Sequence, residues 1–439
     1  MMSDAVTRRR EESRARDPVE RRIALLPSRM HPLAESDRAA HLRWLLELTQ
    51  VPTAAGREQR VVAWVDRWLA ERPDLACSFD PSGNITITLR DAPRTDAPLY
   101  LTAHLDHPAF VVERIVAPGV AELAFRGGVM DDYFDSARVN AHAADDRSFG
   151  ACLAERVDGA SPFFKTYLAE FDDGDAATLA LRPGDVAVWS LPPAEVAERD
   201  GVRCVLTHAC DDLAALGAAL AALDVLRSAR AAGEPVGDVR LLLTRAEEIG
   251  FVGAIAACRH GTIGAGARLI ALENSRSFPD SPIGGGPIVR VGDRVSVFTP
   301  ELTAAVAKVA EELAGGPAQP LATQKQADLP AWRWQRKLMA GGACEASVFC
   351  ASGLASTCVC LPLGNYHNMA DLAAVQAGTN AAPPRVAREY IALADYEGLV
   401  DLLVACGRRL AGPEGATLGS ASFRQRLDKL WNDLRFVLE

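Results

Sequence analysis

Hydrophobic and polar residues follow two different periods along the chain, and the changes of period divide it into segments. Apolar residues recur every three or four positions in AAHLRWLLELTQVP (39–52) and in GREQRVVAWVDRWLAERP (56–73), which predicts two amphipathic helices. The apolar and β-branched runs NITITLR (84–90) and PLYLTA (98–103) follow and predict strands. The first folded segment therefore combines helices with strands.

The helical period disappears in the next segment, between about residues 121 and 200. Short β-like runs such as ARVNAHAA, FGACLAERV and DVAVWSL stand there between clusters of Gly, Pro and Asp. Such a stretch is typical of a small all-β unit inserted into an α/β domain. We expect a barrel-like β domain here.

Alternation of strands and helices resumes after residue 200. The strand-like run GVRCVLTHA precedes an Ala/Leu helix, LAALGAALAALDVLRSARAAG, and DVRLLLT, ARLIALE and LASTCVCLPL are further strands. Near-continuous apolar strands alternating with helices predict an α/β fold with a mixed sheet sandwiched by helices. The tail adds one more amphipathic helix, FRQRLDKLWNDLRFVL, with no evident chemistry.

These patterns predict five segments. They are a charged N-terminal extension (1–36), the first part of the main domain (37–120), the inserted β domain (121–200), the second part of the main domain (201–411) and a C-terminal helical extension (412–439). A chain of 439 residues exceeds one ordinary core, which agrees with more than one domain.

Composition narrows the function classes. A formal net charge of −10 argues against a general nucleic-acid binder, and no apolar stretch is long enough to span a membrane. The N-terminus is charged and has no apolar core of a secretory signal. The ten cysteines form no CxxC pair, and several lie inside apolar runs, which favours a reducing compartment. We therefore expect a cytoplasmic protein.

Candidate chemistry gathers where the predicted strands end. Each of five strands is followed at its end by acidic or imidazole side chains: His104 and Asp106, Asp211 and Asp212, Glu247 and Glu248, Glu273, and His367. In an open α/β sheet that edge is where ligands bind. We expect these groups to converge.

The residue types predict a metal site. Two histidines with several carboxylates and no thiolate suit zinc, manganese or cobalt. One bridging carboxylate, with a His and a carboxylate on each side, gives a two-metal site that polarises a carbonyl and leaves one carboxylate free as a base. The Glu247–Glu248 doublet suits that division, since one glutamate can bind metal while the other moves protons.

Each motif also has an ordinary structural explanation. Glu247–Glu248 could be an acidic pair at a helix N-terminus, and Asp211–Asp212 could be only a helix cap. Glu273 could belong to a turn, and His367 could be a buried, hydrogen-bonded histidine. The metal interpretation is favoured because all five motifs would have to be coincidences together.

The same motifs carry a resemblance. From about residue 42 to 411 the chain resembles family 42 of the metallopeptidases, the glutamyl and deblocking aminopeptidases of the two-metal exopeptidase clan shared with families 28 and 20. The similar stretches, in family order, are VPTAAGREQRVVAWV, DPSGNITITL, AHLDHPAFVV, ALRPGDVAVW, CDDLAALGAAL, AEEIGFVGA and GNYHN.

The resemblance implies a role for each residue. His104 and Glu273 would bind one metal, Glu248 and His367 the other, and Asp211 would bridge the two. Glu247 would be the general base and Asp106 the carboxylate that orients the His104 ring. The Asp211–Asp212 peptide would be cis, as in relatives. His107 and His208 are extra imidazoles, for which we favour supporting roles over metal binding.

The chain also departs from the family pattern. Glu273 stands where the family has Asp, His107 replaces a customary Glu, and Leu213 replaces an Arg. GGACEASVF lacks the usual Gly-Thr-Asp-Ala, which leaves Cys344 or Glu345 in its place. The resemblance therefore supports the assignment of the metal-binding residues. It gives little information about the substrate pocket.

The sequence thus predicts an aminopeptidase that hydrolyses N-terminal residues of peptides with two divalent metal ions, zinc first and cobalt or manganese as alternatives. The resemblance also implies a homo-oligomer, and we expect no nucleic-acid or membrane partner. An amidohydrolase or carboxypeptidase of the N-acyl amino acid deacylase type is an alternative on the same site. A catalytically inactive scaffold protein is a second.

Overall fold

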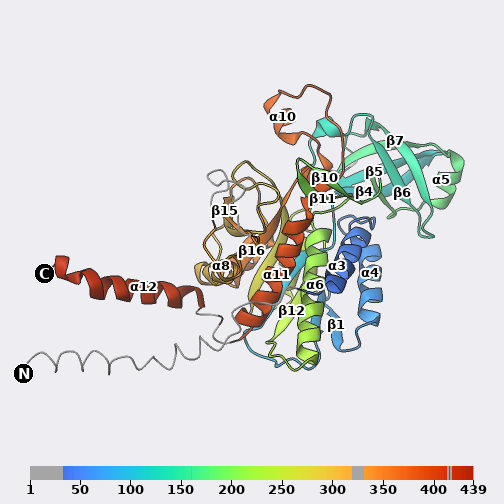
Figure 1. Ribbon diagram of the computed structural model, residues 1–439. Coiled ribbons are helices and arrows are strands. Elements are labelled where there is room, and N and C mark those ends of the chain that lie inside the picture. Colours follow the sequence, from blue (N-terminus) through green and yellow to red (C-terminus); the bar gives the residue numbers. More distant parts are fainter. Residues whose placement is uncertain (1–32, 160, 319–330, 413–414, 416–417, 439) are drawn as a thin grey trace, which may run out of the picture. The chain divides into compact units, whose positions relative to one another are not determined.

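An eight-stranded mixed sheet forms the centre of the computed structural model, which describes residues 33–159, 161–318, 331–412, 415 and 418–438 (Figure 1). The strand order across the sheet is β1-β2-β12-β3-β13-β16-β14-β15. Their bounds are β1 (Leu75–Phe79), β2 (Ile85–Leu89), β3 (Leu99–His104), β12 (Val239–Thr244), β13 (Arg268–Arg276), β14 (Ile288–Asp293), β15 (Gln335–Met339) and β16 (Ala355–Leu363).

Four neighbouring strands at the centre of this sheet run parallel: β12, β3, β13 and β16. Their sequences are nearly continuous apolar runs, because both faces of a central parallel sheet are buried. Parallel strands end at one edge, so whatever follows them is brought together there.

Helices cover both faces of the sheet, as the sequence predicts. On one face, Asn274 of β13 donates a hydrogen bond to Asp212 at the start of α6 (Leu213–Ala231). On the opposite face of the sheet, Leu269 of β13 packs with Phe349 of α9. The first face carries α6 with α3, α8 and α11, and the second carries α7 and α9. The bounds are α3 (Glu35–Leu48), α7 (Val252–Arg259), α8 (Pro300–Ala314), α9 (Glu345–Ala351) and α11 (Leu393–Leu410), with α4 (Gln59–Ala70) following α3 in the chain.

The inserted domain is a closed six-stranded barrel of order β4-β5-β8-β7-β6-β9. Its aromatic centre consists of Phe110, Phe125, Phe134 and Trp189, whose rings lie in mutual contact. The bounds are β4 (Ala109–Ala117), β5 (Val120–Arg126), β6 (Arg138–His142), β7 (Ser148–Arg156), β8 (Lys165–Phe171) and β9 (Val186–Trp189), with α5 (Asp175–Ala180) and the short helix η1 (Asp131–Tyr133) in its loops.

The barrel strands run from Ala109 to Trp189, whereas the sequence pattern suggested an insert from 121 to 200. The difference at the start arises because β4 continues the apolar run directly after the His104 loop, with no linker between them. At the other end, β10 (Glu195–Arg199) leaves the barrel and pairs with β11 (Val202–Thr207).

One strand of the expected central sheet lies elsewhere. β11 pairs with β10 and with β17 (Glu389–Ala392) in a separate three-stranded antiparallel sheet. Its burial alternates only partly, and Arg203 is exposed, so it is not the fully buried strand that its Val and Leu content suggested. The Asp211 motif therefore reaches the site from a second sheet.

The remaining helices lie near the C-terminus: η4 (Tyr366–Asn368), α10 (Leu372–Ala377), α12 (Leu418–Leu434) and η6 (Arg435–Val437). α12 confirms the amphipathic helix expected in the tail. The charged extension at 1–36 lies outside the described residues except for its last four. Within the described part of the chain, no helix combines the length and apolarity needed to cross a membrane. All ten cysteines are free thiols.

Candidate metal centre

Five loops or strand ends bring the predicted residues to one place. His104 ends β3, the Glu247–Glu248 pair follows β12, and His367 follows β16. Glu273 lies within β13 rather than just beyond its end, and Asp211 follows β11 of the small sheet. The convergence expected from the sequence is therefore present, although one of its five contributors comes from outside the central sheet.

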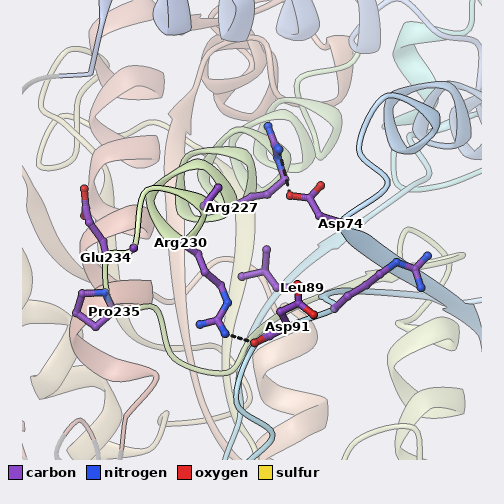
Figure 2. Close-up of a pocket in the computed structure, with 10 residues that line it drawn as sticks. Asp74, Leu89, Asp91, Arg227, Arg230, Glu234 and Pro235 are labelled. Carbon is purple, nitrogen blue, oxygen red and sulfur yellow. Dashed lines mark hydrogen bonds and ion pairs between the residues drawn. The ribbon is translucent and has the colours of Figure 1, made fainter.

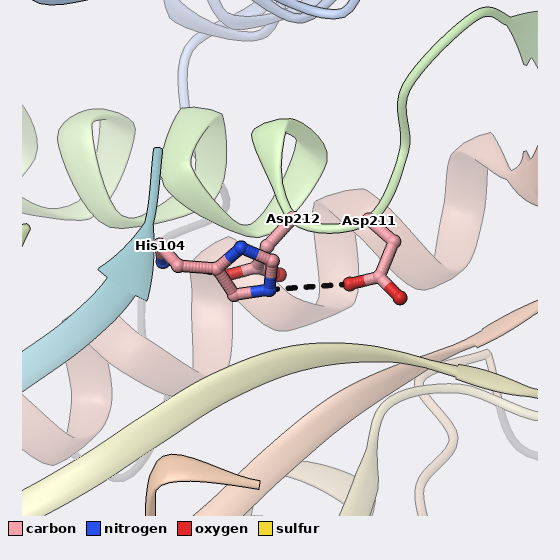
Figure 3. Close-up of side chains that lie close together, drawn as sticks. All are labelled: His104, Asp211 and Asp212. Carbon is pink, nitrogen blue, oxygen red and sulfur yellow. Dashed lines mark hydrogen bonds and ion pairs between the residues drawn. The ribbon is translucent and has the colours of Figure 1, made fainter. Parts of the chain in front are cut away.

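Asp211 lies between the two histidines. Its Oδ1 is 3.5 Å from Nε2 of His104, and its Oδ2 is 3.4 Å from Nε2 of His367 (Figure 3 shows the first contact). His367 Nε2 is also 3.4 Å from a Glu248 oxygen, and His104 Nε2 is 3.9 Å from a Glu247 oxygen. One carboxylate that faces a different imidazole with each oxygen has the placement of a bridging ligand.

The ligand atoms form groups of the size that holds an ion. His104, Glu247 and Glu273 are one such group, and Asp211, Glu248 and His367 are another. A third group joins His104 with Asp211 and Asp212. The Asp212 oxygens, however, accept hydrogen bonds from the His104 amide and the Asn274 side chain, so Asp211 is the better ligand of the aspartate pair.

Several buried atoms at the centre have no protein partner. Asp211 Oδ1, Glu248 Oε1, Glu273 Oε1 and His367 Nε2 are all buried without a hydrogen bond. Orphaned buried acceptors of this kind cost free energy unless something else satisfies them. Cations would do so, and hard-to-borderline divalent ions match the mixture of carboxylate and imidazole. The residues present therefore fit a two-metal centre.

Burial and mutual repulsion dominate the electrostatics. Burial raises the pKa of Glu247 well above its usual value, and the neighbouring charges of Glu248 and Glu345 raise it further. The pKa of Glu273 rises for the same reasons, first burial and then the charge of Glu247. Asp211 differs: burial would raise its pKa, but the two histidines outweigh that and lower it. The carboxylates are thus held together against repulsion, and Asp211 is the one most strongly stabilised as an anion.

The turn that carries Glu247 and Glu248 is held by three earlier motifs. The buried Glu58 carboxylate accepts the amide of Ala246 at 3.0 Å and the guanidinium of Arg245 at 2.8 Å. Asn84 accepts the Arg245 amide at 3.1 Å and donates to the Gly253 carbonyl at 3.0 Å. These contacts fix both ends of the turn.

Asp106 completes that arrangement, and its role differs in part from the expected one. Its carboxylate accepts the amides of Glu247 at 2.9 Å and Glu248 at 3.1 Å. The His104 ring donates instead to the backbone carbonyl of Asp106 at 3.1 Å, while the carboxylate lies 3.5 Å away. Asp106 therefore positions the glutamate pair through its side chain and the imidazole through its backbone.

Glu389 organises the opposite side, and no motif in the sequence pointed to it. Its buried carboxylate accepts the amides of Cys210, Asp211 and His367 at 2.6, 3.1 and 2.8 Å. Burial raises its pKa to about 7. The Asp211–Asp212 peptide is cis, in agreement with the resemblance. One carboxylate thus sets the backbone of both the bridging aspartate and His367.

The barrel reaches into the centre as well. Nδ1 of His367 donates to the carbonyl of Gly128, in the loop after β5, at 2.6 Å. That bond leaves Nε2 of the ring directed at Asp211 and Glu248. A histidine that binds a metal is commonly held through its second nitrogen in this way.

His107, which the sequence left without a role, is wedged between two oxygen atoms. Its Nδ1 contacts the backbone carbonyl of Asp211, and its Nε2 lies 3.0 Å from Oδ1 of Asn368. The Asn368 amide nitrogen donates to the carbonyls of His208 and Ala387, so its oxygen faces the imidazole. Because a backbone carbonyl can only accept, His107 Nδ1 donates to Asp211, and the ring lies between the Asp211 backbone and the segment that carries His367.

The structure also separates Cys344 from Glu345. The Cys344 amide and thiol contact Asp293, in a buried cluster beside β14 and β16. Glu345 is buried with one oxygen unpaired, and burial raises its pKa to about 7. Because its charge acts on Glu247, Glu345 is the acidic neighbour of the candidate base.

A separate hollow lies on the protein surface, away from the candidate metal centre. It measures about 610 Å³ and lies between the end of α6 and the β1–β2 hairpin. Arg227 pairs with Asp74 there, and Arg230 donates to the carbonyl of Asp91 (Figure 2). These two guanidinium groups already have partners within the chain.

Comparisons with known proteins agree with this geometry. A family model described as M42 glutamyl aminopeptidase matches residues 83–315. No curated protein sequence matches the chain.

Three similar solved structures show the same fold. An aminopeptidase from the archaeon Desulfurococcus kamchatkensis is 19% identical, with a TM-score of 0.65 over 87% of this chain and 98% of its own. The Pyrococcus horikoshii TET1 peptidase, which assembles into a tetrahedron or an octahedral shell, is 20% identical, with a TM-score of 0.62 over 84% and 99%. A TET aminopeptidase from a marine sediment thaumarchaeote is 19% identical, with a TM-score of 0.63 over 86% and 99%.

Proposed function

We propose how the residues of this chain carry out the activity of the family to which it belongs. That family is the M42 glutamyl aminopeptidases, because the family model spans more than half of the chain. Membership makes it a two-metal aminopeptidase. The proposal concerns the assignment of individual residues, the metal, the substrate and the assembly. The placement of Asp211 between His104 and His367 supports it most strongly.

We assign His104 and Glu273 to one metal and Glu248 and His367 to the other, with Asp211 shared. The two groups of ligand atoms and their unpaired buried oxygens support that division. When bound, such ions supply a Lewis acid for the peptide carbonyl and lower the pKa of a water molecule.

Glu247 is the general base in this proposal. Its carboxylate lies 3.9 Å from His104 Nε2, and its amide is fixed by Asp106, so it is held beside the metal ligands. Its raised pKa suits a group that takes a proton and returns it to the leaving amine near neutral pH. No ligand or base is missing from the set, which favours an active enzyme over an inactive scaffold.

We propose zinc as the metal, with cobalt or manganese as alternatives, because imidazole and carboxylate donors suit all three. We also propose peptide substrates, a homo-oligomer and a cytoplasmic location. The similar TET peptidase that assembles into closed shells supports the homo-oligomer, and the ten free cysteines support a reducing compartment.

The test is the substitution Glu247→Gln. It should lower kcat on aminoacyl amides by about 10²- to 10⁴-fold while metal content stays unchanged, because the amide cannot carry the proton. Glu155→Gln, on an exposed position of β7, is the matched control and should keep full activity. Undiminished activity of Glu247→Gln would contradict the assignment. Activity only on N-acylated amino acids would instead indicate the deacylase.

A further inference from the structure

The C-terminal helix α12 and the short η6 turn after it carry an unusual concentration of exposed apolar side chains. Between 44% and 80% of the surface of each is exposed, and they number eight: Phe423, Leu427, Leu430, Trp431, Leu434, Phe436, Val437 and Leu438. They make up half of the large exposed hydrophobic residues in the described part of the chain. Exposed apolar surface gathered in this way marks an interaction site.

The base of the helix is fixed while its apolar face is not covered. Its first turn packs on α8, where Gly419 approaches Ala305 so closely that a Cβ would lie 2.6 Å from the Ala305 amide nitrogen. Residues 423–438 are exposed on all sides. The helix also lies beyond residues 83–315, which match the family model.

The spacing of the apolar residues indicates what the face fits. Phe423, Leu427, Leu430 and Leu434 follow intervals of four, three and four residues. Those are the d, a, d and a positions of a heptad repeat, which forms a seam for a second helix. A plain surface helix would need no such seam.

We propose that α12 pairs antiparallel with α12 of a second copy of this chain. In that register Leu427 lies opposite Leu430 of the partner subunit, and Phe423 lies opposite Leu434 of the partner subunit. A twofold rotation maps this arrangement onto itself, as the contact of a closed dimer requires. Every seam residue of α12 then meets an apolar residue.

The charges beside the seam fit the antiparallel direction. Arg426 and Asp433 occupy the g positions, which approach one another across an antiparallel pair, so Arg426 meets Asp433 of the partner subunit. At the e positions, Arg424 meets Trp431 of the partner subunit, which is a favourable cation–π pair. A parallel pair would set Arg426 against tryptophan and Asp433 against leucine, leaving the aspartate without a partner.

The same charges disfavour a membrane surface as the partner. Helices that lie on anionic membranes carry a predominantly basic polar face. In α12 the acidic Asp428 and Asp433 stand among the basic residues Arg424, Arg426 and Lys429. A mixed polar face is typical of a helix that pairs with another helix.

Light scattering on the full-length protein tests the proposal by measuring mass per particle across a dilution series. Leu427→Asp with Leu430→Asp should raise the concentration at which particles dissociate by at least about tenfold, because two buried layers of the seam receive charges. Asp428→Arg, which points away from the seam at a b position, should leave it unchanged. Hydrolysis of a small aminoacyl amide reports that each variant is folded.

A charge exchange tests the partner and the direction. Arg426→Asp and Asp433→Arg should each weaken association, since like charges then meet at both g–g contacts. Mixing these two variants should restore association, because each supplies the charge that the other lacks. Unchanged mass in the Leu427→Asp/Leu430→Asp variant, no rescue on mixing, or binding to anionic vesicles in place of self-association would each overturn the proposal.

Discussion

At the scale of single residues, the centre depends on carboxylates that are used as hydrogen-bond acceptors. Glu58, Asp106 and Glu389 bind no metal in our assignment, yet each accepts two or more amide or guanidinium hydrogens beside the ligands. Bonds to charged acceptors are stronger than neutral ones, so these groups set backbone positions firmly. His107 performs the complementary task by setting its two ring nitrogens against two oxygen atoms.

We predict that His107→Glu destabilises this chain. A carboxylate would face the Asp211 carbonyl and the Asn368 amide oxygen, so acceptors would oppose acceptors in a fully buried position. The free energy of unfolding should fall by about 1–3 kcal/mol, the cost of leaving buried polar groups unpaired. Urea denaturation measures it.

His260→Glu provides the control, because His260 is exposed and its ring lies 2.8 Å from the Ser82 hydroxyl at the surface. Equal stability of His107→Glu and the native protein would show that the two bonds of His107 carry no weight.

At the scale of elements, the segment between β12 and α7 is where the early motifs of the chain meet. Its backbone is held by Glu58, Asn84 and Asp106, which come from three different segments. Gly253, at the second residue of α7, lies against it: a Cβ there would be 2.3 Å from the Arg245 carbonyl and 2.8 Å from the Asn84 side chain. Only glycine permits this approach.

Gly253→Ala should therefore damage both stability and activity. The methyl group forces the Arg245 backbone and Asn84 apart, which displaces Glu247 and Glu248 with them. We expect a loss of about 1–3 kcal/mol in the free energy of unfolding, typical of overpacking, together with a lower kcat. Gly264→Ala, where nothing lies within 4 Å and the backbone is unstrained, should match the native protein in both measurements. A native kcat for Gly253→Ala would mean that the turn does not control the base.

At the scale of the whole molecule, the sequence predicted which layers of helices and strands are present better than it predicted which strand belongs to which sheet. Parallel strands, covering helices and the barrel follow from local periodicity, which is why β3, β12, β13 and β16 were found. β11 was placed in the wrong sheet, because strand pairing depends on partners far away in the chain. The proposed metal ligands could be picked out because strand ends and residue types are local features of the sequence. Glu389 could not, since its function arises only from the three amides that the fold brings to it.

Metal removal should lower the stability of the whole molecule. Burial and repulsion among Glu247, Glu248 and Glu273 oppose folding when no cation offsets them. A metal at about 100 times its dissociation constant adds about 2.7 kcal/mol per site. A chelator should therefore lower the melting temperature of the native protein and of Glu155→Gln alike in a calorimetric scan. The variant His367→Ala should respond less, and an unchanged melting temperature in the native protein would contradict a metal centre.

The hydrogen bond from His367 to Gly128 joins the barrel to the chemistry, and its consequence is thermodynamic. Any barrel movement that breaks this bond weakens the orientation of a proposed metal ligand. By reciprocity, metal occupancy must then hold the barrel in place with the same free energy. The position of the barrel loop and the binding of the ion are therefore thermodynamically coupled. A partner that displaced the Gly128 loop would therefore change the metal affinity of the proposed centre without contacting any of its five proposed ligands.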